Sequence, residues 1–469
     1  MAFCNPQLRL SHPGARLAAL VLAPLLCLEP LAQSAHAEGI SVIRDTEIER
    51  TLRSYEDPIL GAAGIDPHTV RLFLVDDPNL NAFATQSPLG GDEEDIFVNA
   101  GTFLQLKTPN QLIGILAHET GHIAGGDVIH SQMAMQKAAI PMLIGMAVGI
   151  AAMIAGAGGD AGMSAMMLGE QAGVSSFLSF SRTQEATADQ RGQKFLLMTH
   201  QSGNGMVEVF TQMANDAARS AYYNRPFISD HPADRERVDL LQREADASPY
   251  KDVKDKPEVV HQFRLIQAKL AGYLSKPATV LVRYPTSDTS VEARYARALA
   301  YFRQPDMKNA LAESTTLVKD EPNNPYFWEL LGQIYVNMSQ PDKGIGPYQK
   351  SVDLMPDAPL LRISLAAAQI ATERKALAQS ALNNLKIALD QENDNTFGWY
   401  EAAQAYSDVG DEPMANLATA ELDYNMGNFP AAVHFATLAQ HKLAAGSTTW
   451  QRANDILAVA GSEVQKRRH

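Results

Sequence analysis

The alternation of apolar and polar positions predicts a first half of mixed helices and strands. Residues 45–60 carry apolar side chains at helical spacing, which predicts an amphipathic helix that ends near Pro58. Residues 70–75 alternate like a strand, and two short apolar stretches, 81–84 and 96–98, follow on either side of a glycine-rich, acidic segment. Together these three stretches predict a small antiparallel sheet.

The next predicted element is a helix with clear signals at both ends. Thr108 supplies a capping hydroxyl, and Pro109 suits the first helical position. Apolar residues continue at helical spacing as far as Gly125 and Gly126, where the helix should end.

An uncharged stretch at 138–157 is long enough to span a membrane. It is nevertheless rich in Gly, Ala and Met and poor in Leu, Ile and Val, and further methionines follow as far as Met167. Such a surface packs as a buried hairpin, lies against a membrane or adapts to varied apolar partners. For the whole segment 138–178 we favour membrane-proximal or plug-like packing over a true span.

The second half of the chain is helical and repetitive. Residues 246–285 are punctuated by prolines and indicate an interdomain region with one helix near 257–273. The stretch that starts at Trp328 fits the W-x2-L-G-x2-Y signature of a tetratricopeptide repeat, and a second copy starts at Trp399. Four or five such hairpins would stack into a solenoid with a concave groove, and an unrelated helical bundle is the alternative. Other hairpins fit residues 292–320, 359–390 and 413–443.

The N-terminus has the features of a secretory signal peptide. Two arginines precede an apolar stretch at 17–28 that is too short to span a bilayer, and 35–37 offers a small-residue cleavage site. Both cysteines, Cys4 and Cys27, would leave with the signal peptide, since Leu26 before Cys27 does not suit a lipoprotein anchor. A mature chain without cysteine suits an oxidising compartment such as the bacterial periplasm. The alternative is an uncleaved N-terminal anchor.

Composition narrows the classes of function. The chain has 469 residues, 46% of them hydrophobic and 20% charged, which indicates a globular protein of two or three domains. Its net charge of −14 argues against non-specific electrostatic binding to nucleic acid, so we expect no nucleic-acid partner. Two cysteines are too few for a disulfide scaffold or for a cysteine-rich zinc or iron–sulfur site.

The strongest chemical signal is an H-E-x-x-H motif on the predicted 109–125 helix. His118 and His122 share one helix face, about 6 Å apart, so that both imidazoles can bind one Zn²⁺. Glu119 lies beside them and is placed to take a proton from a water that the metal activates. The helix is capped and follows a strand pair, which favours a catalytic site over a pair of ordinary histidines.

A third ligand is needed that leaves one position for water. The metzincin class is excluded because position 128, six residues after His122, is valine. Glu185 is the better candidate, and it would complete a His2Glu site from a second helix. Asp189, one turn further on, would accept the spare N–H of a ligand imidazole. The competing ligands are Asp127, His130 and Glu170.

These residues resemble a known family. The 118–122 motif, the 181–189 segment with Glu185 and Asp189, the upstream 81–84 stretch and the downstream His231-Pro232 are similar to the HtpX/CAAX-protease-like zinc metallopeptidases. The signal peptide and the repeats narrow the resemblance to the BepA-type periplasmic proteases, called β-barrel assembly-enhancing proteases. The several transmembrane helices typical of HtpX are absent from the sequence pattern, which points to the soluble branch.

The resemblance gives a meaning to the segment that begins at His231. In the family, a His-Pro loop with an arginine six residues on lies near the active site, so Arg237 is expected to stabilise the tetrahedral oxyanion. His231 either does the same or occupies the open zinc position and keeps the enzyme latent until the loop moves. A histidine at a helix start without any role is the remaining alternative.

The sequence therefore predicts an α+β zincin-like metallopeptidase domain followed by an all-α tetratricopeptide-repeat solenoid. The resemblance implies a zinc endopeptidase, with one Zn²⁺ per chain, in the periplasm of a Gram-negative bacterium. Its expected partners are unfolded or misassembled outer-membrane proteins, the outer-membrane assembly machinery and a membrane surface. The alternative is a chaperone-like adaptor that docks through its repeats and cleaves weakly. The predicted boundaries are 1–37 for the signal peptide, 38–245 for the peptidase domain, with 138–178 as a lid or membrane-proximal segment, 246–285 for the interdomain region and 286–469 for the repeats.

Overall fold

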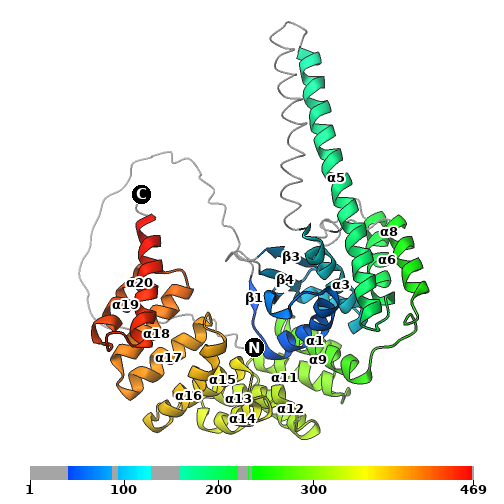
Figure 1. Ribbon diagram of the computed structural model, residues 1–469. Helices are drawn as coiled ribbons and strands as arrows, with labels where there is room; N and C mark the ends of the chain where they lie inside the picture. Colours follow the sequence, from blue (N-terminus) through cyan, green and yellow to red (C-terminus); the bar gives the residue numbers. More distant parts are fainter. Residues whose placement is uncertain (1–40, 87–92, 128–158, 220–230, 232–234, 467–469) are drawn as a thin grey trace, which may run out of the picture.

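The computed structural model describes residues 41–86, 93–127, 159–219, 231 and 235–466. An N-terminal α+β domain is followed by a curved array of helices (Figure 1). This arrangement confirms the predicted fold class. The predicted signal peptide, both cysteines, His130 and the whole uncharged stretch 138–157 lie outside the described residues.

The sheet of the N-terminal domain has four strands in the order β1-β2-β4-β3. The prediction of an antiparallel sheet was wrong for its centre, because β2 and β4 run parallel, whereas β3 pairs with β4 antiparallel. Five of the six residues of β4 are buried, and a strand buried on both faces takes the centre of a sheet, so β4 inserts between β2 and β3. The strands are β1 (Val42–Ile43), β2 (Val70–Val75), β3 (Ala82–Gln86) and β4 (Glu94–Asn99).

Helix α1 (Thr46–Ala63) is longer than its sequence indicated. Asp45 caps its start by accepting a hydrogen bond from the Ile48 N–H, and the helix ends at Gly64, which has a φ of 75°. The predicted end near Pro58 was wrong, because Pro58 lies inside the helix. A proline removes one backbone hydrogen bond, but Ile59 and Leu60 beyond it are fully buried, and their burial outweighs that loss.

Helix α3 (Pro109–Gly125) has the predicted ends. The Thr108 hydroxyl accepts a hydrogen bond from the Gln111 N–H, and Gly126 closes the helix with a φ of 64°. The residues from Gln111 to Ile123 are all buried, so α3 is a central helix of the domain.

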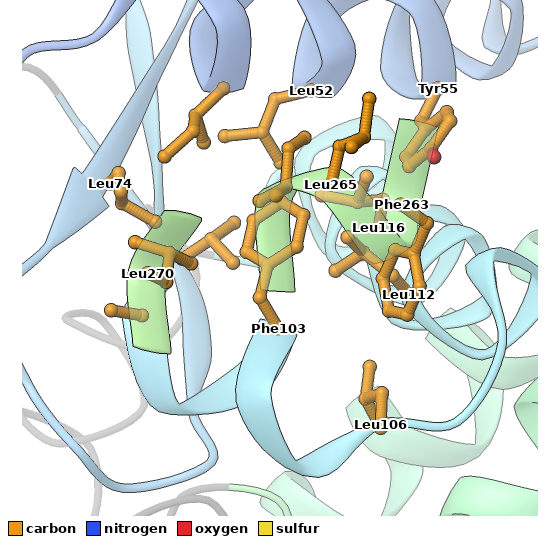
Figure 2. Packing of buried hydrophobic residues seen from close by; sticks show 14 of the residues in the cluster. Leu52, Tyr55, Leu74, Phe103, Leu106, Leu112, Leu116, Phe263, Leu265 and Leu270 are labelled. Carbon is orange, nitrogen blue, oxygen red and sulfur yellow. The ribbon is translucent and has the colours of Figure 1, made fainter. Parts of the chain in front are cut away.

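The core of the domain lies between the sheet, α1, α3 and α9 (Pro257–Leu274), with Phe103 and Phe263 at its centre (Figure 2). The predicted helix near 257–273 is confirmed, and it does more than connect two domains. One apolar cluster extends from Ile43 through α9 to Ile334, so the first repeats share the core of the N-terminal domain. The other elements here are η1 (Pro67–Thr69), α2 (Ala100–Gln105), α5 (Gly159–Met198), α6 (Asn204–Arg219), α8 (Arg235–Ala247) and α10 (Pro277–Arg283).

The helices that follow pack as consecutive pairs, as the repeat signature predicts. On α13 the signature glycine, Gly332, has a packing reason: a Cβ there would lie 2.7 Å from the ring of Tyr348 on α14. Within the described residues the array contains α11 (Val291–Arg303), α12 (Met307–Asp320), α13 (Pro325–Asn337), α14 (Pro341–Leu354), α15 (Pro359–Ile370), α16 (Lys375–Gln391), α17 (Thr396–Val409), α18 (Glu412–Asn425), α19 (Phe429–Lys442) and α20 (Thr448–Lys466).

A buried charge cluster joins the N-terminal domain to the array. Lys269 on α9 is 3% exposed, and its Nζ lies 2.6 Å from Asp45 Oδ2 and 3.1 Å from Glu47 Oε2 at the start of α1. The Tyr295 hydroxyl on α11 donates to Glu47 Oε2 at 2.9 Å. Removing one partner of such a group leaves a buried charge uncompensated, so the cluster holds α1, α9 and α11 in one arrangement.

Helix α5 extends well beyond the body of the domain, and its first turns lie far from the sheet (Figure 1). Met167 and Leu168 on this projecting part are 64% and 66% exposed. Among the described helices, none has the length and hydropathy needed to cross a membrane. The packing of the 138–178 segment as a lid or against a membrane stays a prediction.

Candidate metal centre

The site depends on a close approach between α3 and α5. A Cβ on Gly121, within the H-E-x-x-H motif, would lie 2.5 Å from the backbone oxygen of Ala188 on α5. A Cβ on Gly192 of α5 would lie 3.1 Å from the backbone carbonyl of Ala117 on α3. At Gly121 only a residue without a side chain permits this contact, and at Gly192 a side chain would push the helices slightly apart. The contact brings the predicted ligand Glu185 next to the two histidines.

Four donor groups converge in the buried space between these helices. They belong to His118, His122, Glu185 and His231, and one ligand atom from each lies within 4.8 Å of all the others. The Nε2 atoms of His118 and His122 are 3.1 Å apart, and His231 Nδ1 lies 3.2 Å from His118 Nε2. The structure thus brings together the three predicted ligands and the predicted fourth ligand.

Glu185 closes the group from the α5 side. Its Oε2 lies 3.4 Å from His118 Nε2, and its Oε1 lies 3.4 Å from His122 Nε2. His231 Nδ1 is 3.3 Å from both oxygens. A tetrahedral zinc with metal–nitrogen distances of about 2.0–2.1 Å places its ligand atoms about 3.3–3.4 Å apart. The observed separations and the donor types therefore fit zinc.

In each motif histidine, Nε2 belongs to the donor group, and the second ring nitrogen, Nδ1, faces an aspartate carboxylate. His118 Nδ1 lies 2.9 Å from Asp189 Oδ1, and His122 Nδ1 forms a 2.9 Å hydrogen bond with Asp127 Oδ2. Such partners fix the tautomer and the orientation of a ligand imidazole. Asp189 thus lies where the sequence analysis expected it. Asp127, expected there as a competing ligand, lies behind His122 instead.

Arg237 on α8 contacts the two carboxylates of α5, Asp189 and Glu185. Its guanidinium donates from Nε to Asp189 Oδ2 at 2.8 Å and from Nη2 to Asp189 Oδ1 at 2.9 Å. Its Nη1 also lies 3.1 Å from Glu185 Oε2. These are the contacts of a residue that positions two carboxylates, and a role for Arg237 at the oxyanion stays a prediction.

The segment that carries the donor groups is similar to known proteins. Residues 45–245, which carry all of the donor groups above, match peptidase family M48. This segment is a family M48 peptidase domain. The predicted enzyme class, a zinc metallopeptidase, is confirmed, and zinc is the metal on which M48 peptidases depend.

Longer matches extend beyond the M48 domain. The chain is 23% identical over 381 residues to the beta-barrel assembly-enhancing protease of Yersinia pestis, covering 80% of this chain and 75% of that protein. A Vibrio cholerae protein that carries the same name provisionally is 25% identical over 420 residues, covering 88% of this chain and 83% of that protein. The crystal structure of YrrB, a TPR protein, aligns with a TM-score of 0.28 and 15% identity, over 49% of this chain and 97% of that one.

Electrostatics prepare the M48 site for a cation. Burial alone would raise the pKa of Glu185, but hydrogen bonds with His118, His122 and His231 outweigh burial and hold this pKa well below its usual range. Burial disfavours the charged form of His122, yet Asp127 and Glu185 outweigh it and raise the pKa of His122 to about 10. Glu185 is therefore an anion at neutral pH, although it is almost fully buried.

Glu119, the predicted general base of the M48 domain, is 1% exposed. Its Oε1 lies 3.5 Å from His231 Nε2, next to the donor group. The sequence analysis missed a second carboxyl nearby, Glu56 on α1, which accepts a hydrogen bond from the Thr120 hydroxyl. Burial raises the pKa of Glu56 to about 8. Of the competing ligands, His130 lies outside the described residues, and the Glu170 side chain is not described.

Replacing Gly121 by alanine should disturb the M48 site through packing alone. We expect the Gly121→Ala variant to lose about 1–3 kcal/mol of unfolding free energy in urea and to bind zinc more weakly, because α5 must move away from α3. Gly61→Ala is the matched control, since a Cβ at Gly61 on α1 meets nothing within 4 Å and should stabilise the helix slightly. Equal stability and zinc content in the two variants would contradict this account.

Zinc content tests the ligand set directly. The purified chain should bind about one Zn²⁺, and the Glu185→Ala variant should bind it at least ~10-fold more weakly, since even partners outside the ligand set account for that much. Glu236→Ala, an exposed residue one position before Arg237, is the control and should bind zinc normally. Metal analysis of the dialysed proteins measures both, and full zinc occupancy in Glu185→Ala would exclude Glu185 as a ligand.

Proposed function

We propose that this chain is a periplasmic zinc endopeptidase that degrades misfolded or stalled outer-membrane proteins and assists outer-membrane β-barrel assembly. The observation that carries the proposal is the buried group of His118, His122 and Glu185 beside Glu119 in an M48 domain. The names of the two long relatives support the substrate class and the compartment.

In this proposal His118, His122 and Glu185 hold the zinc. When bound there, zinc supplies positive charge that polarises the scissile carbonyl and makes a water more acidic. Glu119 accepts the proton of the attacking water on its carboxylate and then passes it to the leaving amine. Asp189 and Asp127 keep the two imidazoles in the orientation in which Nε2 faces the metal.

The substrate lies extended along the sheet edge. Strand β3 is one of the two edge strands of the sheet, and it packs against α3, which carries the H-E-x-x-H motif. A chain that adds to this edge is recognised through its backbone, so most sequences bind if they are unfolded. This mode of recognition suits incompletely inserted β-barrel segments.

His231 keeps the resting site latent. Its Nδ1 occupies the fourth place of the donor group, where water and the substrate carbonyl would otherwise approach. Residue 231 lies on the segment before α8, so a movement of this segment would open the site. The exposed Met167 and Leu168 on α5 support contact with a membrane surface.

The second candidate function is a chaperone-like adaptor. The five helix pairs described between 291 and 466 supply a surface for docking on the assembly machinery, while the position of His231 favours weak or conditional cleavage. The intact donor group and Glu119 favour the peptidase, because docking alone requires neither.

Glu119→Gln separates the two functions. The variant keeps the size of the side chain but cannot take up a proton, so cleavage of an unfolded outer-membrane protein should fall by about 10²–10⁴-fold. Zinc content should remain normal. Any contribution to barrel assembly that survives in this variant belongs to the repeats, whereas undiminished cleavage would reject Glu119 as the base.

His231→Ala tests latency. If His231 fills the fourth position in nine molecules of ten, its removal raises the competent fraction, and with it kcat/KM, about 10-fold. The assay is cleavage of an unfolded substrate at equal zinc content. Unchanged or lower activity at full zinc occupancy would reject latency and leave His231 with another role.

A further inference from the structure

Three phenylalanine rings form a continuous stack across the sheet. Phe73 on β2, Phe97 on β4 and Phe83 on β3 are direct cross-strand neighbours. The ring centroids of Phe73 and Phe97 are 5.0 Å apart, as are those of Phe83 and Phe97, and the rings are nearly parallel, at 20° and 17°. We refer to these three residues as the phenylalanine ladder.

The ladder lies on the face of the sheet that points away from the core. Side chains alternate along a strand, and the intervening residues Leu72, Leu74, Ile96 and Val98 are buried in the core with α1 and α3. Phe73 and Phe83 are only half-buried. Phe73 also lines a pocket with Pro359 and Leu360 at the start of α15, so the β2 end of the ladder faces the repeats.

The ladder ends at the edge of the sheet where the proposed substrate binds. The Asn99 N–H donates to the Asn81 carbonyl, and hydrogen-bonded pairs alternate along an antiparallel ladder, so Phe83 pairs its backbone groups with β4. The backbone groups of Ala82 and Ala84 therefore point away from the sheet. A chain that adds to β3 would bind to these two alanines.

An added strand continues the ladder with its own side chain. The substrate residue opposite Phe83 lies on the same face as Phe83, about 4.5–5.5 Å away between Cβ atoms, and residues two positions on flank it diagonally. The substrate residues between them point to the opposite face, toward α3. Alternate side chains of a bound substrate therefore contact different surfaces: one set lies beside Phe83, and the other faces α3.

We propose that Phe83 determines the specificity of this peptidase by selecting an aromatic or large apolar side chain at the substrate position opposite it. The inference rests on the proposed function and names its substrate class: extended segments with an aromatic or apolar residue at every second position. Transmembrane β-strands have this pattern, with aromatic residues near their ends. Aromatic cross-strand pairs are among the favourable pairs in sheets, so a substrate with an aromatic side chain opposite Phe83 should bind more tightly than one without it.

The experiment uses the zinc-loaded full chain and quenched-fluorescence decapeptides of Ser, Thr and Ala in which a single Tyr occupies each position in turn. Mass spectrometry locates the cut bond. We expect kcat/KM to rise about two- to five-fold over the Tyr-free peptide when Tyr lies at one distance from the cut, and to a smaller extent two residues to either side, but not at the positions between.

Phe83→Ala should abolish the preference for Tyr, so that the Tyr-containing and Tyr-free peptides are cleaved with about equal kcat/KM. Phe83→Leu keeps the apolar volume in case the alanine variant folds poorly, and it should reduce the preference. Phe73→Leu is the matched control, because Phe73 lies at the other end of the ladder, two strands from the edge, and should keep the preference.

A preference that survives in both Phe83 variants, or one that recurs at neighbouring rather than alternate positions, would overturn the inference while leaving the peptidase intact. Equal loss of the preference in Phe73→Leu and Phe83→Leu would also overturn it, because the effect would then come from the sheet as a whole. If neither the natural chain nor its His231→Ala variant cleaves any peptide with zinc bound, the proposed function itself fails.

Discussion

The close contact between α3 and α5 is the constraint on which the rest of this structure depends. Two glycines, Gly121 and Gly192, face the backbone of the opposite helix: a Cβ at Gly121 would clash with Ala188, and a Cβ at Gly192 would crowd Ala117. Because the helices touch at their backbones, the Glu185 carboxylate lies 3.4 Å from the Nε2 atoms of both motif histidines. A metal site needs donors held to within fractions of an ångström, and backbone contact supplies that rigidity.

The donor group is in turn held by charges behind it. Arg237 pairs with both Asp189 and Glu185, so one buried cation compensates two buried carboxylates on α5. Asp189 then orients His118, and Asp127 orients His122. Buried ion pairs often add little to stability, but each of these fixes a direction, and direction is what a ligand imidazole requires.

Helix α1 connects this site to the repeats. At its start, Asp45 and Glu47 surround Lys269, while Arg44 forms a 2.8 Å ion pair with Glu392 between α16 and α17. Two residues before Pro58 of this helix, Glu56 accepts a hydrogen bond from the Thr120 hydroxyl inside the H-E-x-x-H motif. The peptidase domain and the first repeats therefore share one apolar core.

The local sequence determined the features that depend on near neighbours. The caps of α3, the spacing of His118 and His122 on one face, and the paired helices with Gly332 beneath Tyr348 all follow from hydrogen bonds and contacts within a few turns. The helix near 257–273 was predicted from the same kind of signal. These contacts form with little loss of chain entropy, which is why patterns of residues reveal them.

Only the tertiary structure decided the pairings between distant segments. The parallel pairing of β2 with β4 depends on the position in the sheet at which the largely buried strand β4 is shielded from solvent. The continuation of α1 past Pro58 depends on the core in which Ile59 and Leu60 are buried. Asp127 and Glu185 are both carboxylates and both candidate ligands in the sequence, yet Asp127 bonds to Nδ1 of His122, whereas Glu185 belongs to the donor group. Which carboxylate faces the metal is set by how α3 and α5 pack, since spacing along the chain carries no information about distance across a helix interface.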